Sequence, residues 1–220
     1  MNQIPLIFLG VFAAIATSFW GLLIVPQSQI GQLESARVDN YLTGYPRPRT
    51  GLASQGAETY RANGCVECHT LQVRSKTQGT DIQRGWGTRR TIAQDYLLES
   101  PVQLGSVRLG PDLTNVGRRQ SDSLTLLRKL YNPRLVSEGS LMPRYEYLFT
   151  KRKLVGDERA SKDALPRDTE PGYEIVPKPE AIALVAYLQS LVSDAPLFSA
   201  PVLGVKTNRT STAAPAKPSK

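Results

Sequence analysis

The sequence predicts an all-α protein in which one transmembrane helix precedes a helical domain. Two patterns carry this prediction. Residues 4–25 form an apolar segment, and no charged side chain occurs before Glu34. Near the other end, Leu184, Leu188 and Leu191 recur at the i, i+4, i+7 spacing of an amphipathic helix, and Pro179 stands at its first turn.

Residues 1–28 are interpreted as an uncleaved membrane anchor. At a rise of about 1.5 Å per residue the apolar segment matches the hydrocarbon core of a bilayer, with Trp20 toward the outer interface. The alternative is a cleaved signal peptide. The segment is too long for the apolar part of such a peptide, no Lys or Arg precedes it, and no clear cleavage site follows.

The rest of the chain divides into a linker, a domain and a tail. We expect a linker at 29–50, a domain at 51–195 and a disordered or partner-bound tail at 196–220, which is rich in Thr, Ala, Pro, Ser and Lys. Within the domain, residues 73–110 are expected to be mostly loop and residues 151–178 an exposed charged insertion. Helices are expected at 51–62, near 91–98, at 121–131 and from residue 179.

The formal net charge of +8 suits an acidic partner surface or anionic lipid, and nucleic acid is the poorest candidate because the basic residues are scattered. No phosphate-binding loop or nucleophile–base pair is evident, and the chain has one histidine, His69. We therefore do not expect the chain to be an enzyme by itself.

The chemistry of the chain is concentrated in the string Cys65-Val66-Glu67-Cys68-His69, which contains both cysteines of the chain. C-x-x-C-H is the attachment signature of c-type haem: two thiols bond to the macrocycle and the histidine binds the iron. A zinc site needs about four ligands, a thioredoxin-like pair needs a preceding strand, and a disulfide leaves His69 unexplained. The string therefore predicts one covalently bound haem c.

The second iron ligand is predicted by elimination, because no other histidine exists. Met142 is the only methionine besides Met1. Methionine opposite histidine raises the reduction potential and suits electron transfer. The alternatives are that Met142 fills the core or that the iron is five-coordinate. Around the haem, we expect the Pro111 carbonyl to accept the second N–H of His69. The candidates for contacts to the haem propionates are Arg74, Trp86 and Arg108.

The chain resembles class I cytochromes c and, more narrowly, the mono-haem subunit of cbb3-type cytochrome c oxidases. The matching segments are residues 60–74 (YRANGCVECHTLQVR), 101–117 (PVQLGSVRLGPDLTNVG) and 142–148 (MPRYEYL). The resemblance implies three to five helices around the haem, with the first helix crossing the last at Gly56, Tyr60 and Tyr187. It also implies a role in passing electrons to a large haem–copper catalytic subunit.

Because haem is attached covalently after export, we expect the domain on the periplasmic side of a bacterial inner membrane. The expected partners are the catalytic subunit, other cytochrome c subunits, a donor cytochrome and lipid. Alternative functions are the cytochrome c subunit of a nitric oxide reductase and a free-standing anchored electron shuttle. A haem enzyme or gas sensor is disfavoured, because Met142 would close the sixth coordination position.

Overall fold

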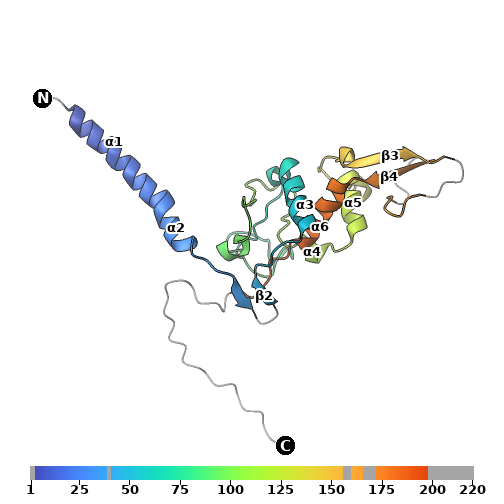
Figure 1. Cartoon of the computed structure of the whole chain (residues 1–220), viewed down its shortest axis with the longest axis horizontal. Coiled ribbons are helices and arrows are strands. Elements are labelled where there is room, and N and C mark those ends of the chain that lie inside the picture. The colour runs from blue at the N-terminus through green and yellow to red at the C-terminus, as the bar shows by residue number, and fades with distance from the viewer. Residues whose placement is uncertain (1–2, 39–40, 156–159, 166–171, 198–220) are drawn as a thin grey trace, which may run out of the picture.

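The computed structural model describes residues 3–38, 41–155, 160–165 and 172–197. Figure 1 shows an N-terminal helix that projects from a globular domain, and a hairpin at the opposite end of that domain. In chain order the helices and strands are α1 (Ile4–Phe19), a π-helical turn (Trp20–Ile24), α2 (Val25–Ile30), β1 (Ala36–Val38), β2 (Tyr41–Tyr45), α3 (Gly51–Ala62), α4 (Val116–Arg119), α5 (Ser123–Tyr131), β3 (Phe149–Lys153), β4 (Tyr173–Pro177) and α6 (Pro179–Ser190).

The helix formed by α1 and α2 is long and apolar enough to cross a membrane. It runs for 27 residues, Ile4–Ile30, and its mean hydropathy is 2.2 over the most apolar window, none of which is buried against the protein. A soluble helix with that composition would bury one face in a core. The helix is therefore a candidate membrane anchor, as the sequence predicted.

The core of the domain forms where α3 packs against α6. Gly56 allows this contact, since a Cβ there would lie 1.9 Å from the carbonyl oxygen of Ala183. One turn later the rings of Tyr60 and Tyr187 meet with their centroids 5.3 Å apart, and both side chains are fully buried. Only glycine leaves room for two helix backbones to approach this closely, so Gly56 sets the packing of α3 on α6.

The helices follow local sequence signals. α3 has the predicted bounds, and α6 begins as predicted with Pro179 in its first turn. α5 begins two residues later than predicted, because the Asp122 carboxylate caps it by accepting the N–H groups of Leu124 and Thr125. The predicted helix near 91–98 is only a 3-10 turn, Ala93–Tyr96.

The all-α prediction is incomplete, because the domain carries two small antiparallel sheets. β1 pairs with β2 inside the predicted linker, and β3 pairs with β4 across the predicted insertion. Nor is that insertion exposed throughout: Leu165 and Ile175 belong to the core, at 3% and 1% exposure. The sequence of β3, FTKRK, lacks the alternation of a half-buried strand, which is why it was missed.

We call residues 31–49 the stalk, because they connect the anchor helix to the domain. Tyr45 of the stalk is buried in a small second core with Ala195 and Leu197. Beside it lies a buried ion pair, in which Arg89 donates to both carboxylate oxygens of Asp95 at 2.6 and 2.9 Å. Tyr45 donates to the same carboxylate at 2.5 Å. The stalk is thus held on the domain by buried polar contacts. The predicted tail begins here, and residues 198–220 lie outside the described part of the chain.

Candidate haem site

The two thiols lie just beyond the C-terminus of α3. Gly64 takes a left-handed conformation, φ +64°, that ends the helix, and the chain enters a 3-10 turn at Cys65–Glu67. The His69 N–H closes this turn by donating to the Cys65 carbonyl at 2.9 Å. Both cysteines are free and partly buried. The turn therefore presents two thiols and an imidazole within five residues.

The His69 ring is oriented by a backbone carbonyl. Its Nδ1 donates to the carbonyl oxygen of Pro111 at 2.8 Å. A carbonyl can only accept, so the proton is on Nδ1 and the lone pair is on Nε2, the arrangement of a metal-binding imidazole. Burial is the main effect on the ring and lowers the pKa of His69 below its ordinary value. The imidazole is therefore neutral near neutral pH, with Nε2 able to bind a metal.

Two glycines let the backbone approach this histidine. A Cβ on Gly110 would lie 2.3 Å from Cε1 and 2.7 Å from Nδ1 of His69. Gly105 has φ +70°, and a Cβ there would lie 2.4 Å from the His69 carbonyl oxygen. Any larger residue at position 110 would have to push the imidazole aside, so Gly110 forms one wall of the site.

Asp112, the next residue after Pro111, is fully buried and anchors the loop behind His69. Its carboxylate accepts the Thr70 hydroxyl at 2.7 Å and the backbone N–H groups of Gln72 and Thr114 at 2.8 and 2.9 Å. A buried carboxylate is stable only with such donors. Asp112 thus joins the segment after His69 to the Pro111 carbonyl that orients the ring. From the sequence only Pro111 was predicted to contact His69, and the role of Asp112 was not predicted.

Arg108 lies over the same loop with its side chain 13% exposed. Its guanidinium donates to the Thr70 hydroxyl at 2.8 Å, to Asp81 at 2.6 Å and to the Gln72 carbonyl at 2.8 Å. This predicted haem-environment residue is therefore in the polar network behind His69. Asp81, which was not predicted, is 2% exposed and neutralises it.

Trp86 and Arg74 lie differently with respect to this network. The guanidinium carbons of Arg84 and Arg108 lie over the Trp86 ring, at 5.1 and 5.3 Å from its centroid. Arg74 joins through its backbone N–H, which donates to Asp81 at 2.8 Å, while its side chain is exposed. The structure thus brings Trp86 and Arg108 together and leaves the Arg74 side chain at the surface.

Met142 reaches the site from a separate loop. It is half-buried and packs against the same core cluster as Cys65. Two contacts fix this loop: the Tyr145 N–H donates to the Leu130 carbonyl at 2.9 Å, and the Tyr147 hydroxyl donates to Asn63, just before the Cys motif. The fold therefore brings the methionine loop and the Cys motif together, although Met142 lies 73 positions after His69 in the sequence.

These groups fit a covalently held haem better than the other uses of a cysteine pair. Burial raises the pKa of the Cys65 thiol to about 11, whereas an attacking thiol in a redox pair has a lowered pKa. Among the described residues no cluster of three or more His, Cys, Asp or Glu side chains could hold a metal ion. Two thiols, an imidazole with the lone pair on Nε2 and a thioether are instead the side chains that hold a c-type haem, and Gly110 leaves room beside the imidazole.

A family model for the mono-haem subunit of cytochrome c oxidase, FixO, matches residues 4–174. The chain belongs to the FixO family. Membership implies one haem per chain and association with other oxidase subunits, and it agrees with the resemblance found in the sequence. No match was found among curated proteins. The FixO match spans the candidate anchor, the Cys motif, the glycine wall and the methionine loop, so the site described above lies entirely within it.

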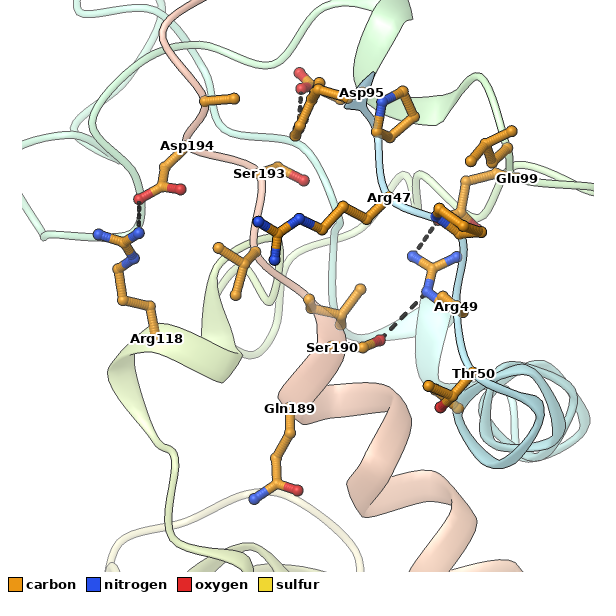
Figure 2. Close-up of a pocket in the computed structure, with 18 of the residues that line it drawn as sticks. Arg47, Arg49, Thr50, Asp95, Glu99, Arg118, Gln189, Ser190, Ser193 and Asp194 are labelled. Carbon is orange, nitrogen blue, oxygen red and sulfur yellow. Dashed lines mark hydrogen bonds and ion pairs between the residues drawn. The ribbon is translucent and has the colours of Figure 1, made fainter. Parts of the chain in front are cut away.

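A cavity of about 740 Å³ in this FixO chain lies elsewhere, between the stalk and α6. Figure 2 shows its charged side chains, in which Arg49 pairs with Glu99 and Arg118 pairs with Asp194. Arg47 extends into the space between these two pairs. The lining contains no thiol, imidazole or thioether, so this cavity is not a second site for haem.

Proposed function

We propose that this chain is the electron-input subunit of a terminal cytochrome c oxidase of the cbb3 type. One haem c, bound through Cys65 and Cys68, would pass electrons to the haem–copper catalytic subunit. His69 and Met142 are the proposed axial ligands. The observation that carries the proposal is the orientation of His69, whose Nδ1 is held by Pro111 so that Nε2 is free beside two thiols.

When bound, the haem supplies one-electron redox chemistry, and the chain's own residues set its conditions. Pro111 and Gly110 fix the ring of His69, and the Asp112 network keeps that carbonyl in place. Met142 supplies a soft sulfur ligand that favours a raised potential. Arg108 and Trp86 are proposed to set the electrostatic environment of His69 through the polar network behind the ring. Arg74 is proposed to reach a haem propionate from the surface.

The same proposal places the domain on the periplasmic side of a bacterial inner membrane, with the N-terminus in the cytoplasm. Two observations support it: the apolar helix Ile4–Ile30 precedes the domain, and c-type haem is attached after export. The other proposed partners are further cytochrome c subunits of the complex and a donor cytochrome.

Oxygen uptake by the complex that copurifies with a tagged chain tests this function. With reduced cytochrome c as donor, we expect cyanide-sensitive uptake, with b-type haem and copper present. The matched control replaces both cysteines, Cys65→Ser with Cys68→Ser, and should assemble without this haem and lose most of the uptake. Consumption of nitric oxide but not oxygen would point to a nitric oxide reductase. Consumption of neither gas, with no large subunit present, would point to a free shuttle.

A further inference from the structure

An uncharged groove lies where the anchor helix meets the haem domain. Its volume is about 390 Å³, and none of its ten lining residues carries a charge. The anchor side contributes Ile30 and Leu33, and the domain side contributes Tyr96, Leu97, Val102 and Leu104, among others. In Figure 1 the green segment that contains the domain-side residues lies beside the end of α2. The groove therefore includes Ile30, the last residue of the anchor helix.

The length of the anchor places this groove at the membrane surface. A helix of 27 residues is about 40 Å long at about 1.5 Å per residue, whereas the hydrocarbon core is about 30 Å thick. If the apolar segment spans the core from Ile4, the last turns of α2 reach the headgroup layer. Ile30 then lies in that layer, and so does the groove that it lines.

The side chains of this face are turned in the way that a lipid contact requires. Both hydroxyl-bearing side chains of the lining point inward: Tyr96 donates to the Leu71 carbonyl at 2.6 Å, and Thr91 donates to the Val73 carbonyl at 3.4 Å. Aliphatic side chains point outward instead. Val102 is 46% exposed and Leu104 is 38% exposed.

The stalk contacts hold this face against the anchor. The 3-10 turn at Ala93–Tyr96 contributes Tyr96 to the groove and Asp95 to the buried ion pair with Arg89. Tyr45 of the stalk donates to Asp95, and Gln94 of the same turn donates to the backbone of Glu34. The turn is thus fixed to the stalk at two points, which keeps the groove beside the end of the anchor.

We propose that the face formed by residues 92–104 rests in the interfacial layer of the bilayer, with a phospholipid acyl chain in the groove. This inference rests on the part of the proposed function in which the helix Ile4–Ile30 spans the membrane. It gives the haem domain a second contact with the membrane besides its anchor. The haem would then be held at a fixed height and orientation for electron transfer.

Photocrosslinking in native membranes tests this contact with the full chain. Val102 is replaced by p-benzoyl-phenylalanine, the membranes are irradiated, and adducts are identified by mass spectrometry. We expect a phospholipid adduct at least ten times more abundant than in a control chain with the same replacement at Leu135, which is equally exposed but lies outside the groove. An unchanged haem spectrum shows that both chains have folded.

Two results would overturn the lipid contact. A crosslink from position 102 to another subunit would make this face a protein interface instead. Lipid adducts no more abundant than at position 135 would leave the face in water. Oxygen uptake by the same membranes is measured in parallel, so that a chain that supports uptake without a lipid adduct contradicts this inference and leaves the proposed function standing.

Discussion

The two sides of the proposed haem site are built differently. Behind His69, the buried Asp112 and the nearly buried Arg108 connect the loop through many short hydrogen bonds. On the other side, the Met142 N–H donates to the Ser140 hydroxyl at 3.3 Å, and the adjacent Leu141 is 88% exposed. The His69 side is fixed by a network of polar contacts, whereas the Met142 loop is fixed by the contacts of Tyr145 and Tyr147, which follow the methionine.

The His69 side should therefore matter for both stability and iron ligation, and the Met142 side mainly for redox chemistry. Changes behind His69 should damage the fold and the iron ligand together, because buried polar groups lose their partners there. Changes at Met142 should alter the redox chemistry more than the stability, since a thioether in a half-buried loop is easily replaced by another side chain. Single substitutions on the two sides should therefore have different consequences.

The largest effect on the haem is expected for Gly110→Ala. The new Cβ would lie within 2.3 Å of the His69 ring, so the imidazole must move. We expect loss of histidine-ligated haem in the optical spectrum and a free energy of unfolding lower by about 1–3 kcal/mol. Gly139→Ala in the Met142 loop is the matched control, since nothing lies within 4 Å of its Cβ. Equal spectra for the two variants would contradict the contrast.

Asp112→Asn should lower the free energy of unfolding by about 3 kcal/mol. The fully buried carboxylate has four donors around it, and asparagine removes its charge and replaces one accepting oxygen by an NH₂ group. Guanidinium unfolding of the haem-loaded chain measures this loss. Asp163→Asn, at an exposed position, serves as the control and should stay within about 0.5 kcal/mol of the parent. A loss at position 112 no larger than at position 163 would be inconsistent with an anchoring role.

Met142→His should lower the reduction potential while the fold persists. The shift is expected to be on the order of 0.1–0.3 V, part of the range of about 0.8 V that axial ligands set. Met142→Leu should change the free energy of unfolding by less than about 1.5 kcal/mol. Redox titration of the haem band reads the first effect and denaturation the second. A potential that does not change with histidine would remove Met142 as a ligand.

Tyr147→Phe tests the contact that ties the Met142 loop to the Cys motif. The lost hydroxyl donates to Asn63, and the Tyr147 side chain is 58% exposed. We expect a loss of about 0.5 kcal/mol, the low end for a hydrogen bond open to solvent. Thermal unfolding measures it, and a loss as large as that of Asp112→Asn would show that the two sides are equally constrained.

The smallest effect concerns the hairpin beyond the Met142 loop. The Ser161 N–H and then Arg152 lower the pKa of the Glu174 carboxyl. A carboxyl with a lowered folded pKa stabilises above its ordinary pKa, and this contribution is lost as the pH falls through the folded pKa. The protection of the β3 and β4 amides against hydrogen exchange should therefore be lost in acid before that of the α3 amides. Glu174→Gln should remove this pH dependence, and its persistence would assign it to another group.

Local patterns allowed much of this molecule to be predicted. The Cys motif, the bounds of α3, the start of α6 and the apolar helix are encoded by neighbouring residues, and so could be found without three-dimensional information. The hydrogen bond from His69 to Pro111 crosses 42 positions, yet the need of a metal-binding histidine for a second partner pointed to it.

The rest depends on contacts that leave no local signal. Arg108 looks like any solvated arginine until the fold places Asp81 beside it, 27 residues earlier in the chain. Asp112 lies in a string that also fits an ordinary turn. β3 was missed because its exposed face is basic and its partner, β4, lies about 20 residues farther on. Such residues are identified by burial and pairing, which the sequence alone does not contain.

Stopped-flow mixing of the fully reduced, purified complex with oxygen tests the central claim most directly. The absorbance of the haem c bound to this chain is followed while oxygen is consumed. We predict that this haem is oxidised within a single turnover, and that the Met142→His complex, with its lower potential, shows an altered rate in the same step. A haem that stays reduced while the complex turns over repeatedly would contradict a place for this chain on the electron path.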